Sequence, residues 1–366
     1  MGYRICRLSA LLGAALLAAC AAPAPSSPPT VAPPQAPSTA KPAGAAPTAG
    51  PPPRVSLKTA VIGSPSDAGL YLAEERGYFR EQGIENEFVF FDTGARIPPA
   101  LGTEQVQVGG GALSAGFFNA VGQNIRLKIV ADKGLVANGW GFEGLMVRKD
   151  LLDSGQVRTV ADLRGRKVAH AAEANGTHWM LDLIMRSGGL SDRDLDLVTM
   201  PFPDMVAALG NHSIEAAMYL EPNGVRAEDL GVGVRWVSGD QVYPNFQLAT
   251  LWYSESFAQQ PDLGRRFMVA YLRGVRDYND AFLRNRQRDE IVALIARHAT
   301  VKDPELYKRM WPPKLHPDGL INLDSLRDEY QWYADRGYIR NPLDPLSIVD
   351  DSFRQAAVAE LGPAGE

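Results

Sequence analysis

Residues 57–91 read LKTAVIGSPSDAGLYLAEERGYFREQGIENEFVFF and carry the clearest local structural signal of the chain. Leu57–Ile62 is a short apolar strand candidate, and residues 63–67 form a Gly-Ser-Pro-Ser-Asp loop. The next residues predict a helix that Gly77 ends. Glu85–Phe91, rich in Phe and Val, predicts a second strand. This order favours an α/β unit in which the helix covers a parallel pair of strands.

The same alternation continues to about residue 255. In the first set, further strands are expected at 106–109 and 127–131. A second set begins near Thr159, with strands expected at 167–171, 195–199, 214–219 and 232–237. After a last strand through 246–251, helices are expected at about 261–285, 289–298, 303–310, 322–336 and 350–361. We predict an α/β protein of two lobes, each a mixed, mostly parallel sheet flanked by helices, with a helical C-terminal tail.

The two sets also predict the domain boundaries. Lobe 1 is expected to comprise residues 55–140, completed by 245–366, and lobe 2 to comprise 148–240. The chain then crosses between the lobes twice, near 141–147 and 239–245. Two crossings make a hinge that permits closure.

Several short motifs, in order along the chain, resemble one family. GLYLAEERGYF at 69–79 and QGI at 82–84 resemble the opening of the periplasmic binding proteins for nitrate, sulfonates, taurine and thiamine-type pyrimidines. TVADLRGRKV at 159–168, GGL at 188–190, Met-Pro at 200–201 and the segment 214–222 are similar to its later landmarks. The resemblance covers about 57–255. It implies a type II periplasmic-binding fold and the substrate-binding protein of an ABC transporter, without specifying the ligand.

The N-terminus predicts export and a lipid anchor. Arg4 and Arg7 precede the apolar segment Leu8–Ala19, which is too short to span a bilayer and is typical of a secretory signal. Residues 17–20, Leu-Ala-Ala-Cys, resemble a lipobox, so we expect 1–19 to be a lipoprotein signal peptide and Cys20 to be lipidated. The alternative is an ordinary signal peptide that contains a cysteine. Residues 20–54, nearly all Ala, Pro, Ser, Thr and Gly, predict a disordered tether.

Composition narrows the function. The two cysteines are Cys6 and Cys20, so the chain after Cys20 can form no disulfide, cysteine-ligated zinc site or cysteine nucleophile. A net charge of −5 without a Lys/Arg cluster argues against a nucleic-acid partner. We expect no cofactor, no metal and a monomer, lipid-anchored to the cell membrane at its periplasmic or extracytoplasmic face.

The binding site is expected where strands end and helices begin. In open α/β lobes, ligands bind beyond the carboxyl ends of strands, where helix N-termini offer free N–H groups and partial positive charge. Loops 64–67, 110–114 and 175–178 meet this condition, as do residues at the crossings and after the strand at 214–219. The expected ligand contacts are Ser64, Asp67, Ala112, Ser114, Trp140, Gly176, Thr177, His178, Tyr219, Glu221, Asn245 and Phe246.

Some of these residues have a structural alternative. Thr177 can bind an anionic group or simply cap its helix, and His178 can face the cleft or hold a structural position. Trp140, between two glycines, can stack on a ring or pack in the core. Glu221 can accept hydrogen bonds from an amine, an amide or a protonated ring, or be a surface acid beside Pro222.

The expected set suits a small planar or partly apolar solute better than a bare inorganic anion. A heteroaromatic organic solute is favoured, with sulfonates as the alternative. The expected mechanism is hinge closure on the solute, followed by delivery to an ABC permease and its ATPase. The chain itself has no G-x-x-x-x-G-K-[ST] phosphate loop.

Two rival functions are weaker. The family's fold also contains a pyrimidine synthase and a desulfinase that use cysteines, which this chain lacks after Cys20. Neither G-x-S-x-G nor H-E-x-x-H occurs, so we expect no enzyme. The second rival is a ligand-sensing or protein-binding lipoprotein, whose contact face would contain Trp311, Tyr330, Trp332 and Tyr333.

Overall fold

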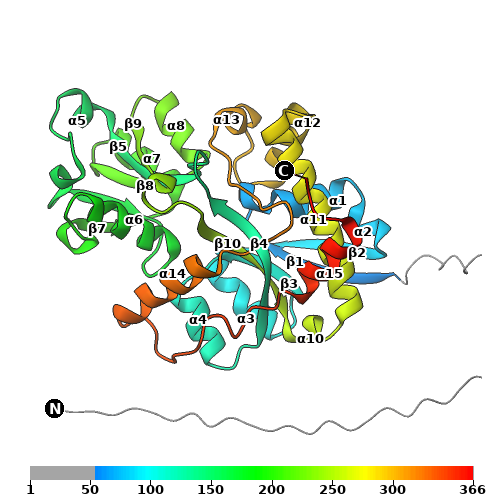
Figure 1. Cartoon of the computed structure of the whole chain (residues 1–366). Coiled ribbons are helices and arrows are strands. Elements are labelled where there is room, and N and C mark those ends of the chain that lie inside the picture. Colours follow the sequence, from blue (N-terminus) through cyan, green and yellow to red (C-terminus); the bar gives the residue numbers. More distant parts are fainter. Residues whose placement is uncertain (1–53, 366) are drawn as a thin grey trace, which may run out of the picture. The chain divides into compact units, whose positions relative to one another are not determined.

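The computed structural model describes residues 54–365 (Figure 1). The predicted signal peptide, Cys20 and all of the predicted tether except Arg54 lie outside these residues. The strands of the described part form two sheets of five strands each. No helix in this part is long and apolar enough to cross a membrane.

The first sheet has four parallel strands and one that runs against them. The antiparallel strand, β10, lies between β3 and β4, and all nine of its residues are buried. Its sequence, FQLATLWYS, is the largely apolar run expected of a strand covered on both faces. In spatial order the strands are β2 (Ile84–Phe90), β1 (Val55–Val61), β3 (Val108–Ala112), β10 (Phe246–Ser254) and β4 (Leu127–Val136).

The second sheet repeats this arrangement, with β5 as the antiparallel strand. We expected residues 141–147 to be a connection, but 143–148 form this strand. Strand β5 forms by pairing with β8 and β9, which lie about 70 to 95 residues downstream. A local sequence pattern does not indicate partners at that distance. In spatial order the strands are β7 (Asp196–Thr199), β6 (Lys167–His170), β8 (Ala216–Leu220), β5 (Glu143–Arg148) and β9 (Gly233–Ser238).

Helices connect and cover the sheets. The five predicted C-terminal helices are confirmed, with ends within two residues of those expected, whereas α2, α3, α5, α8, α9 and α10 were not predicted. The α-helices are α1 (Ala68–Glu75), α2 (Tyr78–Glu81), α3 (Ile97–Gly102), α4 (Ala115–Gly122), α5 (Lys149–Asp153), α6 (Gly176–Ser187), α7 (Phe202–Gly210), α8 (Asn223–Asp229), α9 (Gly239–Val242), α10 (Glu255–Ala258), α11 (Pro261–Arg284), α12 (Arg288–His298), α13 (Pro304–Arg309), α14 (Leu323–Asp335) and α15 (Ser352–Leu361). The 3₁₀ helices are η1 (Pro65–Asp67), η2 (Gly94–Arg96), η3 (Val160–Leu163) and η4 (Asp192–Asp194).

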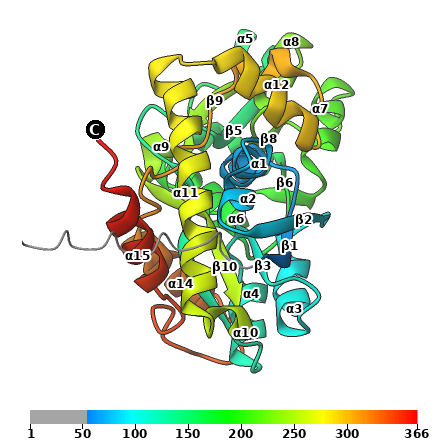
Figure 2. The same cartoon turned by 90° about the vertical axis from the view of Figure 1, so that its right-hand side faces the viewer.

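One core lies under the long helix α11. Pro261 occupies its first turn, where a missing N–H costs nothing, and Asn285 ends it in the left-handed conformation. Helix α11 packs against α1, α2 and α15, as Figure 2 shows. The glycines of α1 and α11 allow a close approach, since a Cβ on Gly274 would collide with the carbonyl oxygen of Gly69.

A second core continues from one sheet to the other. Trp252 of the first sheet and Met218 of the second belong to the same buried cluster. Helix α14 takes part in it and contacts both β10 and α6 (Figure 1). Its Tyr330 ring packs edge-on against Phe118 of α4, with 4.9 Å between the centroids. This cluster positions the elements around the candidate site.

Candidate functional site

The loops before α4 and α6 meet at the carboxyl ends of the two sheets. The backbone N–H of Ala115 donates to the carbonyl oxygen of Ala174 over 2.9 Å, and Ser114 and Asn175 form an isolated antiparallel bridge. Each loop also caps its helix: Ser114 Oγ accepts from Phe117 N, and Asn175 Oδ1 accepts from His178 N. Predicted site segments far apart in sequence are therefore in direct contact here.

Gly176, Thr177 and Phe246 come together at this junction. Phe246 is fully buried and packs edge-on against Trp179, 5.4 Å between centroids. A Cβ on Gly176 would lie 2.9 Å from the Phe246 ring and 3.0 Å from Oε1 of Glu329. Glycine is therefore required at the first residue of α6, because any side chain would displace one of these two groups.

Two buried acids that the sequence analysis did not select face this place. Glu143, the first residue of β5, is 0% exposed, and neither carboxylate oxygen accepts a hydrogen bond. Glu329 of α14 is also 0% exposed; its Oε1 accepts from Tyr333 over 2.5 Å, while Oε2 has no partner. Desolvation is the main cause that raises the pKa of each acid to about 8, and the charge of Glu143 adds to the increase at Glu329.

Thr177 is the polar neighbour of Glu143. Its hydroxyl interacts with the carboxylate strongly enough to oppose the rise in pKa, although the contact does not have the geometry of a hydrogen bond. A signal for Glu143 was present, because it is an acid inside the apolar segment GFEGLMV. Glu329 shares the helical face of Leu326, Tyr330 and Tyr333, and this spacing already predicts burial.

The stability of the protein should decrease as pH rises, through these two acids. Both pKa values are higher in the folded state than the unfolded value of about 4.5, so folding takes up protons between pH 4.5 and 8. Below pH 4.5 both acids are protonated in the folded and in the unfolded protein, so they do not make the stability depend on pH. Between pH 4.5 and 8, each acid lowers the free energy of unfolding by ~1.4 kcal/mol for every pH unit.

Glu143→Gln should therefore flatten the pH dependence. We expect its free energy of unfolding to gain about 2 kcal/mol on the wild type between pH 6 and pH 7.5. Urea titrations at both pH values measure this difference. Glu87→Gln, at an exposed acid on β2, serves as the control and should keep the wild-type slope. Parallel slopes for wild type and Glu143→Gln would contradict the assignment.

Ser64 and Asp67 form a self-contained turn rather than an open contact surface. Asp67 is 0% exposed and pairs with Lys133 Nζ at 2.6 Å, and Lys133 is equally buried. The other oxygen of Asp67 accepts from the N–H groups of Ile62 and Ser64 and from Tyr71. Ser64 Oγ accepts from Ser66 N. Lys133 therefore neutralises Asp67, and the predicted contact of Asp67 with a solute stays a prediction.

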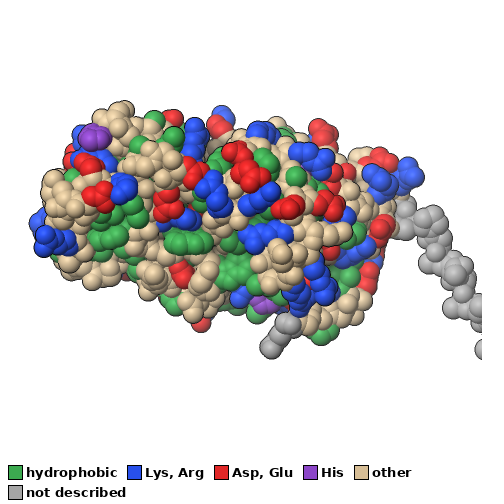
Figure 3. All heavy atoms as spheres, turned by 90° about the horizontal axis from the view of Figure 1, so that it is seen from above, with side chains coloured by type: hydrophobic (Ala, Val, Ile, Leu, Met, Phe, Trp, Pro, Cys, Tyr) green, Lys and Arg blue, Asp and Glu red, His purple; other side chains and the backbone are tan. Residues whose placement is uncertain are grey.

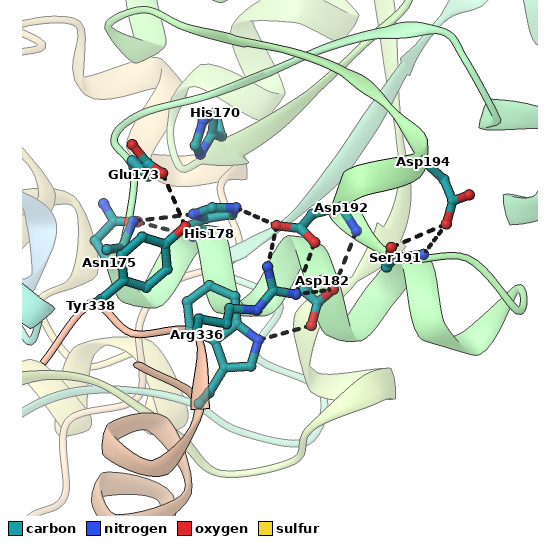
Figure 4. A network of polar contacts seen from close by, with 12 residues as sticks. His170, Glu173, Asn175, His178, Asp182, Ser191, Asp192, Asp194, Arg336 and Tyr338 are labelled. Carbon is teal, nitrogen blue, oxygen red and sulfur yellow. Dashed lines mark hydrogen bonds and ion pairs between the residues drawn. The ribbon is translucent and has the colours of Figure 1, made fainter. Parts of the chain in front are cut away.

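His178 holds the structural position that was the alternative for it. Its ring is 3% exposed; Nδ1 accepts from Ala174 N and Nε2 lies 2.8 Å from Asp192. Figure 4 shows that Arg336 continues this network to Asp192 and Asp182. No ring nitrogen of His178 remains for a solute.

The side chains of Tyr219 and Glu221 also have partners close to the second sheet. Tyr219 is fully buried and its hydroxyl donates to the carbonyl oxygen of Gly141 over 3.1 Å. Glu221 pairs with Arg235 and accepts from Val225 N. Burial is the largest cause that raises the pKa of Glu221, with Arg235 opposing it. Glu221 is thus neither a surface acid nor a free acceptor.

The remaining predicted residues lie at the edges of the junction. Trp140 is half-buried at the first crossing, next to Gly139, whose φ is +77°. Asn245 is exposed, has a φ of +64°, and its carbonyl oxygen accepts from Asn322 Nδ2. Ala112 is half-buried at the end of β3. These positions lie beside the junction, and their contact with a solute stays a prediction.

The hollows on the surface of the described residues lie away from this junction. Two open hollows, of about 620 and 640 Å³, lie along the edge strand β2 and beside α3. Among residues 54–365, no group of three or more His, Cys, Asp or Glu side chains is placed to hold a metal ion. On the face seen in Figure 3, acidic and basic side chains are interspersed. That face therefore has no continuous basic patch.

Comparisons with known proteins place the fold. Residues 64–280 match the family described as NMT1/THI5 like. A search of curated proteins found no match. The alkanesulfonate-binding protein SsuA from Xanthomonas axonopodis, bound to MOPS, is 16% identical with a TM-score of 0.63, over 82% of this chain and 99% of that one.

Two further structures have the same architecture. The periplasmic nitrate-binding protein NrtA from Synechocystis is 14% identical with a TM-score of 0.65, over 84% of this chain and 89% of that one. A mutant of DSZB in complex with biphenyl-2-sulfinic acid is 17% identical with a TM-score of 0.57, over 83% and 99%. The predicted type II periplasmic-binding fold is confirmed: two mixed five-stranded sheets flanked by helices, with helices at the C-terminus.

Proposed function

This chain belongs to the NMT1/THI5-like family, and we propose that it is the solute-binding protein of an ABC importer. It captures a small organic solute between its lobes and delivers it to a membrane permease powered by an ATPase. The observation that carries this proposal is the junction itself. Unpartnered carboxylate oxygens, Thr177 and the Phe246 ring converge where the strands of both sheets end.

Closure about the two crossings is the proposed mechanism. We propose lobes of residues 55–140 with 245–366, and of residues 148–240; because strand β5 (Glu143–Arg148) belongs to the second sheet, it supports a start of the second lobe near Glu143. Gly139 and Asn245 have positive φ values at the two crossings, so both turns are sharp. The direct hydrogen bond from Ala115 N to the carbonyl oxygen of Ala174 joins the two proposed lobes and supports this mechanism. A solute stabilises it only through contacts that it makes better in the closed than in the open form.

The proposed location is the extracytoplasmic side of the cell membrane. Cleavage before Cys20, lipidation of its thiol and a tether over residues 20–54 would hold a monomeric binding protein near its permease. Export also fits the description of the nitrate-binding relative as periplasmic. We propose no catalytic role, because residues 54–365 contain no cysteine nucleophile.

A combined thermal-shift and small-angle scattering screen tests this function. The compounds are taurine, alkanesulfonates, nitrate, pyrimidines, aromatic carboxylates and polyamines. A cognate solute at ~100 times its dissociation constant should add ~2.7 kcal/mol of stability. It should also change the scattering curve of the purified chain, because closure makes it more compact. Compounds that stabilise the protein but leave the scattering curve unchanged would contradict hinge closure.

Trp140→Ala should remove most of the stabilisation by the compound found in that screen. The half-buried ring at the first crossing is expected to lie against the solute. Phe90→Ala is the matched control, because Phe90 is 56% exposed on the edge strand β2. Thermal shifts measured with and without the compound separate binding from folding. An equal shift in wild type and Trp140→Ala would exclude this residue from the site.

A further inference from the structure

We propose that the solute is a small organic cation, whose protonated amine is bound between Glu143 of β5 and Glu329 of α14. This inference rests on the proposed function, since it names the chemical class that the same site accepts. It differs from the ligands named for two of the similar structures, an alkanesulfonate-binding and a nitrate-binding protein. Three features of the site support it: the unused acceptors, the occupied helix start and the balance of charge.

The first feature is the set of unused acceptors. Three carboxylate oxygens of the pair have no hydrogen-bond partner, namely both of Glu143 and Oε2 of Glu329. Both side chains are 0% exposed, so bulk solvent does not reach them. Buried polar groups are normally hydrogen-bonded, and an unmade bond costs roughly 1–3 kcal/mol. A primary ammonium group carries three N–H donors and no acceptor, which complements this set.

The second feature is the start of α6. The partial positive charge and free N–H groups of a helix N-terminus suit an anion. In this chain the place is taken by a carboxylate of the protein, because Oε1 of Glu329 lies 3.0 Å from the Cβ position of Gly176. Tyr333 holds the same oxygen over 2.5 Å. A sulfonate or nitrate would have to displace the Glu329 side chain to reach this helix N-terminus.

The third feature is the charge balance around the junction. The acid of the loop after β1, Asp67, is neutralised by Lys133, and Glu221 is paired with Arg235. His178 is held by Asp192. The acids left without a cationic partner are Glu143 and Glu329, which come from β5 of the second sheet and from α14, which contacts β10 of the first. Because burial raises the pKa of each acid to about 8, both are mainly protonated at neutral pH without a cation, and a bound cation favours their ionised form. Closure therefore brings the two acids around a cation.

The nature of the cation follows from the surroundings. Two carboxylates without a third His, Cys, Asp or Glu do not make a metal-ion site within the described residues. The Phe246 and Tyr333 rings and Thr177 supply apolar walls and one hydroxyl at the same place. Aromatic faces attract organic ammonium groups, especially away from water. An amine carried on a small apolar or aromatic body fits this combination.

The test compares probes of one shape and three charges on the wild-type chain. Benzylamine, benzyl alcohol and benzoate form one series; 4-aminomethylpyrimidine and its alcohol and carboxylate form a second; and agmatine, putrescine, butanesulfonate and nitrate complete the panel. Isothermal titration calorimetry gives affinities and thermal shifts give stabilisation. We expect at least one amine to bind more than tenfold tighter than its matched alcohol and acid.

Variants then locate the cation. Glu143→Gln and Glu329→Gln keep the size of each side chain, and each should weaken binding of that amine at least tenfold. Glu173→Gln is the control, because Glu173 is exposed near the start of α6 and outside the pair. It should bind the amine as the wild type does. If a variant folds poorly, the affinities of the matched amine, alcohol and acid for the wild-type chain still test the inference.

The outcomes separate this inference from the proposed function. If anions alone bind and compact the protein, the solute-binding function stands and the cation site is refuted. Amine binding that is unchanged in both glutamine variants also refutes it. If no probe and no compound of the wider screen changes either stability or scattering, the proposed function itself fails. Amine binding that both variants weaken supports the inference.

Discussion

Arg336→Ala should lower the free energy of unfolding by about 3–5 kcal/mol, because it leaves two buried aspartates without their shared cation. The guanidinium lies 2.8 Å from Asp182 and 2.7 Å from Asp192, whose side chains are 0% and 4% exposed. It also stacks on the Trp332 ring, 4.3 Å from its centroid. Burial raises the pKa of Asp192, but the hydrogen bonds with His178 and Arg336 outweigh it and hold this pKa well below its usual range, so the carboxylate stays charged at neutral pH.

Arg186→Ala is the matched control. Arg186 pairs with the same Asp182 at 2.8 Å, but its side chain is 57% exposed. An exposed pair is screened by water and contributes about 0–1 kcal/mol. Urea unfolding of both variants at pH 7 measures the contrast. Losses of equal size would show that burial does not set the strength of this network.

The Arg336 network also constrains closure. Arg336 follows α14, whereas Asp182 and Asp192 belong to α6 and η4, which cover the second sheet (Figure 4). The Trp332 indole also donates to Asp182 over 2.8 Å. Helix α14 is thus fastened to the second sheet by charge and to β10 by packing. Any opening of the lobes must keep α14 with one side and part it from the other.

Local signals explain why most of the fold could be predicted. The turn residues and caps around η1, α4 and α6 lie within a few residues of the elements that they start. The period of the apolar residues is equally local, so strands and C-terminal helices were placed within a few residues. Strand β5 could not be predicted because its six residues form a strand by pairing with β8 and β9. Pairing partners at that distance leave no mark on a short window of sequence.

The candidate site was harder to predict, for a related reason. Position at a strand end is visible in the sequence, but the partner that neutralises a charge is not. Asp67 meets Lys133, and Glu221 meets Arg235, so two predicted contacts are already satisfied. Glu329 was overlooked for the opposite reason: an acid on a helix suggests exposure, whereas its face of α14 is buried. Long-range pairing decides which acids remain unpaired.

Lys133→Met should lower the free energy of unfolding by about 3–5 kcal/mol, because Asp67 would stay buried without its cation. The 2.6 Å contact joins two side chains that are both 0% exposed. The double variant Lys133→Met with Asp67→Asn should recover most of this loss, since it removes both charges. The amide oxygen that Asp67→Asn introduces can still accept from the N–H groups of Ile62 and Ser64. Urea titrations of the single and double variants give the coupling energy.

Room for this lysine is built into the neighbouring strand. A Cβ on Gly110 of β3 would lie 2.6 Å from Cδ of Lys133, so the glycine lets the lysine stem pass across the sheet to the loop after β1. Lys167→Met provides the control, because Lys167 pairs with Asp196 at 3.6 Å while 44% exposed, and should lose less than about 1 kcal/mol. If Lys133→Met were as mild as this control, the buried pair of Lys133 and Asp67 would contribute no more to stability than an exposed pair does. The charge balance that leaves Glu143 and Glu329 as the unpaired acids would then have to be revised.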